Sequence, residues 1–339
     1  MGNSSQFLVF SAALTLAGLG AGDVLYGRYA ENHFVPNMTL QRAEAAGSAC
    51  LVTLGDSRMA AGIDSPALRD ALRAHGVETC VAPLAVGALP ISGQAMAMRR
   101  LLRDGHTPQW VVLGASAGSL LDEDSPDPSA LVGNRAAELA WSEPSDVYRY
   151  YPGFPFADLD RGVRFSFARS NALSIYASAT WIKAQGLQDR LVRSQPAAPR
   201  TRFGALSDMQ ALFGVFRGAA LAALSRSNGD YTLNRWFELV RRLTHERGAQ
   251  LVVLEVPMTS RYRDEVLDSA AGKRYRDWLV NQLAASGDLF LDLSAPQSVQ
   301  DQNFSDGIHL DEAGAKAFSD ELGVKLAALI LQRSVPHAP

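Results

Sequence analysis

Two short stretches near opposite ends of the chain carry the residue types that acyl transfer through a serine requires. Ser57 lies in a Gly-Asp-Ser tripeptide that directly follows the apolar run Cys50–Leu54, and Asp306 lies three residues before His309. A serine nucleophile needs a base to take its hydroxyl proton and a carboxylate to orient that base. One loop can present an aspartate and a histidine at this spacing to the same point. The sequence therefore predicts a catalytic site made of Ser57, His309 and Asp306.

A second serine offers an alternative nucleophile. Ser116 is the centre of the pentapeptide GASAG, which follows the apolar residues WVVL and fits the G-x-S-x-G pattern of a nucleophile elbow. Two features count against this interpretation. Pro126 cuts short the helix that normally follows an elbow serine, and no HGGG-like donor loop precedes the motif. We therefore expect Ser57 rather than Ser116 to be the nucleophile.

Apolar runs alternate with helical patterns along most of the chain. The runs that predict strands are Cys50–Leu54, Glu78–Ala82, Trp110–Leu113, Gln250–Val256 and Leu289–Leu293. The patterns that predict helices cover 66–75, 94–103, 231–247, 262–285 and 311–331, with Asp311 as the N-cap of the last. This alternation predicts an α/β fold, an open parallel five-stranded sheet flanked by helices. Ser57 and the segment with His309 both follow a strand and precede a helix, so they should meet at the carboxyl edge of the sheet.

Residues 120–228 interrupt this alternation. They predict a large, mostly helical insertion that acts as a lid or acceptor-binding element, because so long an interruption of a compact fold is usually functional. Its aromatic residues Trp141, Tyr148, Tyr150 and Tyr151 could stack on sugar rings or pack the insertion onto the core. The catalytic domain then consists of residues 49–119 and 229–333, and residues 334–339 form a tail.

The first 28 residues contain an apolar, uncharged stretch, Phe7–Gly22, that predicts a signal peptide or signal anchor and so a membrane attachment. The stretch is short for a membrane span, which needs about 20 residues. No Lys or Arg precedes it, so the positive-inside rule does not support export, and a buried core helix is the alternative. Residues 29–48 predict a polar linker.

Composition excludes several classes of function. The chain has 339 residues and a net charge of -3, which gives no electrostatic case for nucleic-acid binding. Its two cysteines, Cys50 and Cys80, exclude a disulfide-rich scaffold and a Cys-based zinc site. They fall in predicted neighbouring strands, so a disulfide and two buried thiols are both open. We expect no metal and no cofactor.

The motifs together resemble the SGNH (GDSL-type) hydrolases. The Gly-Asp-Ser tripeptide resembles the family's first block, and the segment from Asp306 to His309 resembles its closing D-x-x-H block. Residues 83–87, PLAVG, resemble the second block, whose glycine, here Gly87, supplies a backbone oxyanion donor. The third block usually reads G-x-N-D, and Ser116 stands in the place of its asparagine. The resemblance implies a flavodoxin-like three-layer sandwich, an acyl-enzyme on Ser57, and an oxyanion site formed by Ser57, Gly87 and Ser116.

The N-terminal segment, the insertion and the arginine after the nucleophile are similar to membrane-tethered SGNH proteins of the cell envelope, such as the alginate O-acetylation proteins and the lipoteichoic-acid D-alanylation protein. This resemblance implies an ester hydrolase or O-acyltransferase that acts on acyl (acetyl) groups of envelope carbohydrate or on a small ester. It also implies a periplasmic or extracytoplasmic location, membrane-anchored or secreted, and a membrane-bound acyl-donor protein as partner. Substrate contacts are expected from Arg58, Met258, Arg261 and Tyr262. The alternative is a non-catalytic carbohydrate-binding or scaffold protein of the envelope on the same frame.

Overall fold

The structure is a computed structural model that describes residues 43, 50–87, 89–121, 200–201, 204–226 and 229–334. All of them belong to one compact unit, Thr39–Ser125 with Ala197–Pro339. The N-terminal apolar segment, most of the linker, the aromatic residues named in the insertion and the tail after Ser334 lie outside the described residues. The predictions that concern those segments therefore stay predictions.

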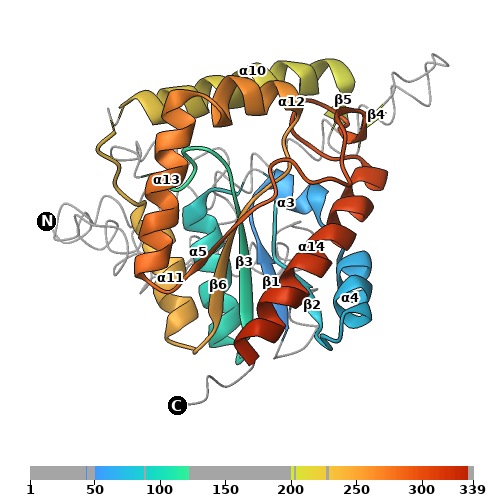
Figure 1. The fold of residues 1–339 in the computed structure, drawn as a ribbon, viewed down its shortest axis with the longest axis vertical. Helices are drawn as coiled ribbons and strands as arrows, with labels where there is room; N and C mark the ends of the chain where they lie inside the picture. The colour runs from blue at the N-terminus through green and yellow to red at the C-terminus, as the bar shows by residue number, and fades with distance from the viewer. Residues whose placement is uncertain are drawn as a thin grey trace, which may run out of the picture. The chain divides into compact units, whose positions relative to one another are not determined.

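Five parallel strands form an open sheet in the order β2-β1-β3-β6-β7 (Figure 1). They are β1 (Leu51–Leu54), β2 (Val81–Pro83), β3 (Trp110–Ala115), β6 (Gln250–Glu255) and β7 (Leu289–Asp292). The chain builds β2 on one side of β1 and then crosses to β3 on the other side, which is the flavodoxin-like strand order. This confirms the predicted fold class. It also makes the carboxyl ends of β1 and β3 the switch point at which α/β proteins bind ligands.

Helices cover both faces of the sheet. They are α3 (Ser57–Gly62), α4 (Ser65–Ala74), α5 (Ile91–Arg103), α10 (Leu206–Arg226), α11 (Arg235–His245), α12 (Ser260–Tyr262), α13 (Ala270–Ala285) and α14 (Glu312–Ser334). Figure 1 shows α14 crossing in front of the sheet, packed on α4, while α5 lies behind it, packed on α11. Because both faces are covered, the central strands are mostly apolar, and no residue of β1 is more than 1% exposed.

The prediction of one continuous helix over 262–285 is wrong, because a bend at residues 268–269, near the start of this range, interrupts it. A π-helical turn, η2 (Arg263–Leu267), follows α12, and α13 begins only after Ser269. The Ser269 side chain accepts a hydrogen bond from the Gly272 N–H at 3.0 Å, so Ser269 is the N-cap of a new helix. A Cβ atom at Gly272 would lie 2.1 Å from the Val266 carbonyl oxygen. Only a glycine therefore allows so tight a break.

Cys50 and Cys80 form a disulfide, which answers the question that the sequence left open. Their Cα atoms are 4.6 Å apart, and the bridge joins the starts of β1 and β2. The same two segments are also joined by a hydrogen bond from the Leu51 N–H to the Cys80 carbonyl at 2.8 Å. Within the part of the chain that the structure describes, no helix is both long enough and apolar enough to span a bilayer.

Helix α10 comes from the stretch predicted as an insertion, but it belongs to the compact unit of the sheet. It runs across the upper end of the sheet, at the carboxyl edge (Figure 1). Two short antiparallel strands, β4 (Arg200–Thr201) and β5 (Gly204–Ala205), lead into it. Helix α10, which precedes α11 in the sequence, therefore covers the carboxyl edge of the sheet.

Candidate active site

Ser57 is the first residue of α3, at the point where the chain leaves β1. Two glycines make room for this helix. A Cβ atom at Gly55 would lie 2.3 Å from Met59 Cγ, and one at Gly114 of β3 would lie 1.9 Å from the same atom. Met59 is 1% exposed, so its buried side chain anchors α3 between the ends of β1 and β3. This packing holds Ser57 at the switch point of the sheet.

The structure brings Ser57, His309 and Asp306 into one hydrogen-bonded chain. His309 Nε2 lies 2.8 Å from Ser57 Oγ, and His309 Nδ1 lies 2.7 Å from Asp306 Oδ2. His309 is 2% exposed, and the Asp306 side chain is fully buried. With an ionised Asp306, the Nδ1–H donates to the carboxylate, which leaves Nε2 as the acceptor for the serine proton.

Asp306 is held in its ionised form by the groups around it. Burial alone would raise the pKa of this carboxyl, but hydrogen bonds and the charge of His309 outweigh it and hold the pKa below its usual value. Asp306 Oδ1 accepts from the N–H groups of Ile308 and His309, both at 2.7 Å. Because these donors belong to the same short loop, the aspartate also fixes the loop that carries the histidine.

The loop around His309 is closed at its base. The Ser305 N–H donates to the His309 carbonyl at 2.9 Å, and the Asp311 N–H donates to the Asn303 carbonyl at 2.8 Å. Asp311 then caps α14, as predicted, by accepting from the Gly314 N–H at 2.7 Å. The imidazole therefore projects from a loop that is anchored to the last helix of the fold.

Two backbone donors lie where an oxyanion could form. The loop after β2 runs beside the nucleophile turn, since the Val86 N–H donates to the Gly55 carbonyl at 3.1 Å. A Cβ atom at Gly87 would lie 3.8 Å from Ser57 Cβ, so the two backbones are close neighbours. Among the described residues, the N–H groups of Gly87 and Ser57 have no hydrogen-bond acceptor. Both are available to an oxygen bound beside Ser57 Oγ.

Ser116 lies at the carboxyl end of β3 and is 6% exposed. Its N–H donates to Ser119 Oγ at 3.0 Å, and its carbonyl accepts from the Ser119 N–H at 3.0 Å. Residues 117–120 form a turn rather than the helix that follows an elbow serine. The geometry therefore favours Ser57 as the partner of His309 and leaves Ser116 as a neighbour in the third loop of the same edge.

The Arg58 side chain is paired with Asp56, the residue before the nucleophile. Its guanidinium forms an ion pair with Asp56, with Nε 3.1 Å from Oδ1, and the Arg58 side chain is 8% exposed. The Arg58 N–H also donates to Asp56 Oδ1 at 2.9 Å, which makes Asp56 the N-cap of α3. Burial raises the pKa of Asp56, but Arg58 outweighs it and the net shift is downward. The pair stiffens the turn on either side of Ser57.

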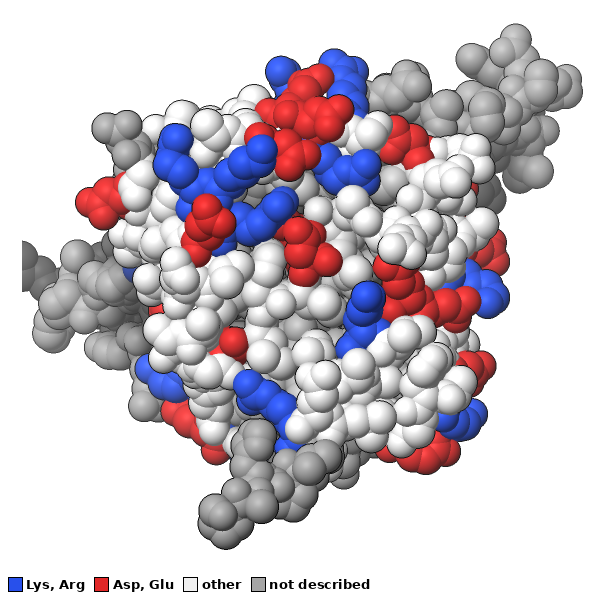
Figure 2. Space-filling view, viewed as in Figure 1, with Lys and Arg blue, Asp and Glu red and all other residues white. Residues whose placement is uncertain are grey.

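The other predicted substrate contacts differ in exposure. Met258 and Tyr262 are each 1% exposed, and burial raises the pKa of the Tyr262 phenol. The Arg261 side chain is 69% exposed, and its Nε lies 2.8 Å from Glu265 Oε1. Their role in substrate binding stays a prediction. The three residues lie around α12 at the carboxyl edge. In the upper part of the face that Figure 2 shows, Lys and Arg side chains alternate with Asp and Glu side chains.

A buried glutamate near the site was not predicted from the sequence. Glu255, the last residue of β6, is 5% exposed, and its Oε2 lies 2.9 Å from Arg276 Nε. Burial raises the pKa of Glu255 to about 7, although the charge of Arg276 opposes the shift. A signal was present, since a glutamate ends the apolar run LVVLE at the edge where ligands bind.

The described residues contain no group of three or more His, Cys, Asp and Glu side chains that could hold a metal ion. The site instead has a nucleophile, a base, an orienting carboxylate and two backbone N–H donors beside the nucleophile. These are the parts that acyl transfer through a serine uses. Fold and site together define an α/β protein with a Ser–His–Asp triad at the carboxyl edge of an open parallel sheet.

No family model and no curated protein matches the chain. Among solved structures, the chain is similar to a lipase/acylhydrolase from Enterococcus faecalis, with 14% identity, 86% of this chain and 100% of that chain covered, and a TM-score of 0.38. It is also similar to TesA, with 13% identity, 82% and 99% covered, and a TM-score of 0.33. At these values the likenesses carry no information about activity.

Proposed function

We propose that the protein is an SGNH-type serine acyl-ester hydrolase or O-acyltransferase that forms an acyl-enzyme on Ser57. The observation that carries the proposal is the unbroken pair of hydrogen bonds, 2.8 Å from Ser57 to His309 and 2.7 Å from His309 to Asp306. These two hydrogen bonds require that all three side chains are placed and oriented together. A serine and a histidine with only a structural role would not need this arrangement.

In the first half of the reaction, Ser57 Oγ attacks the acyl carbonyl carbon while His309 Nε2 takes the hydroxyl proton. Asp306 stabilises the imidazolium that forms, and the N–H groups of Ser57 and Gly87 donate to the new oxyanion. The tetrahedral intermediate then collapses, the ester C–O bond breaks, and His309 returns its proton to the leaving alcohol. The acyl group is now an ester of Ser57.

In the second half, His309 takes a proton from the incoming acceptor, whose oxygen attacks the carbonyl carbon of the acyl-enzyme. The bond between this carbon and Ser57 Oγ then breaks, and His309 returns the proton to Ser57. Water gives a free acid, and a sugar hydroxyl gives a new ester. The same residues serve both outcomes, so the choice depends on which acceptor reaches the carbonyl carbon.

For the substrate, we propose an acyl group, acetyl in particular, on cell-envelope carbohydrate, supplied by a membrane-bound acyl-donor protein. Two observations support a location outside the cytoplasm. Cys50 and Cys80 are disulfide-bonded, which fits an oxidising compartment. The sequence also begins with an apolar segment, Phe7–Gly22, that fits a signal peptide or anchor.

The test of the nucleophile is covalent labelling by a fluorophosphonate, followed by intact mass measurement. Wild-type protein should gain one label, Ser57→Ala should gain none, and Ser116→Ala should still be labelled. Both variants should keep the thermal unfolding midpoint of the wild type. Labelling that persists in Ser57→Ala and disappears in Ser116→Ala would move the nucleophile to the elbow motif and contradict the proposal.

The test of the acceptor uses p-nitrophenyl acetate as donor, with and without an oligosaccharide of the envelope type. A transferase should release nitrophenol faster when the oligosaccharide is present and should yield acetylated sugar, detected by mass. A hydrolase should release acetate at a rate that the sugar does not change.

A second candidate is a non-catalytic carbohydrate-binding or scaffold protein of the envelope. One observation favours it: the residue at the family's asparagine position is Ser116, whose shorter side chain is buried in a turn with Ser119. This candidate predicts no labelling of the wild type and saccharide binding that Ser57→Ala leaves unchanged. Labelling and binding together separate the two.

A further inference from the structure

Helix α10 carries two phenylalanines that contact both loops of the site. Phe213 lies against Gly307 of the Asp–His loop, where a Cβ atom would come within 2.3 Å of Phe213 Cδ2. Phe216 lies beside the residue that follows the nucleophile, with Arg58 Cζ 5.8 Å from its ring centroid. Residues three apart on a helix lie on the same face. One face of α10 therefore lies against the loop of the base and against the arginine that follows the nucleophile.

Phe213 is itself held from the other side. The guanidinium carbon of Arg261 lies 5.0 Å from the Phe213 ring centroid, and the Tyr262 ring meets Phe213 edge-on with centroids 6.2 Å apart. Arg217 of α10 and Arg261 both form ion pairs with Glu265 of the π-helical turn. An aromatic ring fixed by a cation and a second ring has few positions to choose from.

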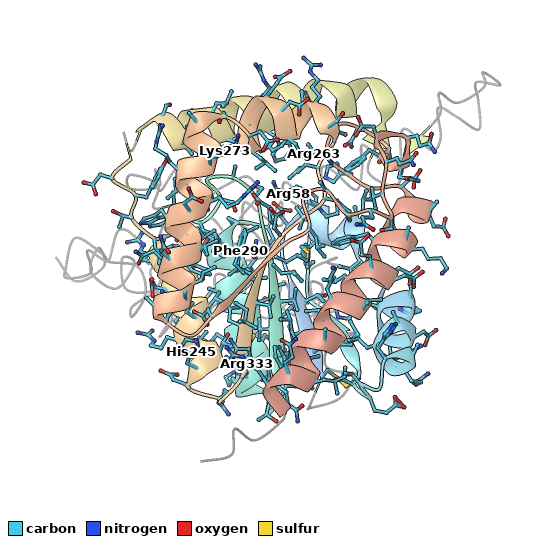
Figure 3. All side chains as sticks on the ribbon, viewed as in Figure 1. Arg58, His245, Arg263, Lys273, Phe290 and Arg333 are labelled. Atoms are coloured by element: carbon cyan, nitrogen blue, oxygen red, sulfur yellow. A yellow bond between two sulfur atoms is a disulfide. The ribbon has the colours of Figure 1, made fainter. Side chains whose placement is uncertain are left out.

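The far end of α10 is also anchored to the carboxyl edge. A Cβ atom at Gly118, in the turn after β3, would lie 3.0 Å from Ala223 Cβ. Gly118 has a φ of 78°, a conformation that favours glycine, so the turn can approach the helix this closely. Figure 3 shows Arg58 and Arg263 below α10, close to α12. The helix thus spans the site and is fixed on both sides of it.

We propose that Phe213 and Phe216 are positioning residues and that α10 acts as a clamp on the triad. The clamp holds the Asp–His loop and the nucleophile loop at the separation that the 2.8 Å contact between His309 and Ser57 requires. Gly307 has no side chain, so the Phe213 ring supplies the packing that fixes this part of the loop. The inference rests on the proposed function, because the geometry that it protects is that of acyl transfer.

This clamp gives the interrupting stretch of the chain a role in the chemistry itself. The two loops come from residues 252 apart in the sequence and are bridged by a helix that lies between them in the sequence. A displacement of about 1 Å between reacting groups can cost about 10²-fold in rate, so a modest loosening of the clamp should be visible in turnover.

The first test compares Phe213→Ala and Phe216→Ala with Leu221→Ala, which truncates an apolar side chain on the same helix. The two phenylalanine variants should lose about tenfold to hundredfold in kcat for p-nitrophenyl acetate, with KM changed by no more than about twofold. Leu221→Ala should keep the wild-type kcat, and Phe213→Leu should recover part of the loss. An equal loss in Leu221→Ala, or none in Phe213→Ala, would overturn the clamp.

The second test uses the contact itself. Gly307→Ala places a methyl group within 2.3 Å of the Phe213 ring, so it should push the Asp–His loop away and lower kcat at least as much as Phe213→Ala. Combining the two substitutions removes the ring contacts at 2.3 and 2.8 Å and leaves only the contact of 2.9 Å with the Cβ atom of residue 213, so kcat should rise above the level of Gly307→Ala alone. If the double variant stays at the level of Gly307→Ala while folded, the ring contact is not the cause and the inference fails.

A proton NMR readout separates the clamp from the proposed function. The His309 Nδ1–H that donates to Asp306 should give a downfield resonance, which needs no turnover to observe. Loss or broadening of this resonance in Phe213→Ala but not in Leu221→Ala supports the clamp, and its retention in both overturns it. Wild-type protein that shows the resonance but neither turnover nor labelling would refute the proposed function. The resonance in Phe213→Ala and Leu221→Ala would still decide whether the clamp exists.

Discussion

The Nε2 atom of His309 lies 2.8 Å from the Oγ atom of Ser57, although 252 residues separate them in the sequence. Both follow strands whose carboxyl ends share one edge of the sheet. The last helix ties the two segments together, because Ser319 Oγ of α14 accepts a hydrogen bond at 2.8 Å from the Asp64 N–H, between α3 and α4. The contact is thus a product of sheet topology and of the packing of α14.

Asp306→Asn should lower kcat for an ester substrate by about 10³- to 10⁴-fold, because an amide neither stabilises the imidazolium nor selects the right tautomer of His309. Steady-state kinetics with p-nitrophenyl acetate measures this. The matched control is Asp301→Asn, an exposed aspartate that accepts from the Ser260 N–H at 2.8 Å. Equal losses in the two variants would argue against a special role for Asp306.

Gly87→Pro should lower kcat/KM by about 10²- to 10³-fold, because proline removes the backbone N–H that would donate to the oxyanion. Gly87→Ala keeps this N–H, and its methyl group would lie 3.8 Å from Ser57 Cβ, an ordinary contact. It should therefore stay close to the wild-type rate. Thermal unfolding should confirm that both variants fold. A proline variant with full activity would exclude Gly87 as a donor.

Glu255→Gln should flatten the pH dependence of stability. The pKa of Glu255 is about 7 in the folded protein and near 4.5 when unfolded, so the folded state binds more protons between these values. The stabilising contribution of the protonated form is complete below about pH 4.5 and is lost as the pH rises through about 7. The loss is on the order of 3 kcal/mol.

Urea unfolding at about pH 5 and pH 8 measures this difference, and wild-type protein should lose more stability between the two than Glu255→Gln does. Arg276 keeps a partner in the variant, since its Nη1 lies 3.5 Å from Asp292 Oδ2. The control is Glu78→Gln, whose side chain is 74% exposed and which should behave as wild type. Parallel pH profiles of wild type and Glu255→Gln would contradict the raised pKa.

Removing the disulfide with Cys50→Ala and Cys80→Ala should lower the free energy of unfolding by about 3–4 kcal/mol, because the bridge closes a loop with a sequence separation of 30. Activity per folded molecule should be unchanged, since the bridge lies at the start of β1 and Ser57 follows its end. Urea unfolding measures the loss, and wild-type protein under reducing conditions should unfold at the midpoint of the double variant. A selective loss of kcat would show an unexpected link between the two ends of the strand.

Much of the fold was predictable because its signals are local. Strands buried on both faces are mostly apolar, and the N-cap Asp311 stands directly before the helix that it starts. The break between α12 and α13 was missed, since it depends on Gly272 packing against the carbonyl of Val266. Helical periodicity continues across such a break, so composition gives no sign of it.

The chemistry of the candidate site could also be predicted, because it depends on residue types and short spacings: a serine after a strand, and an aspartate three residues before a histidine. Contacts between distant segments could not be predicted. The burial of Glu255 against Arg276, the pairing of Arg58 with Asp56 rather than with a ligand, and the packing of Phe213 on Gly307 were all found in the structure. Each of these depends on which side chains meet when helices and loops from separate parts of the chain pack together, and that packing minimises the free energy of the whole fold rather than of any one segment.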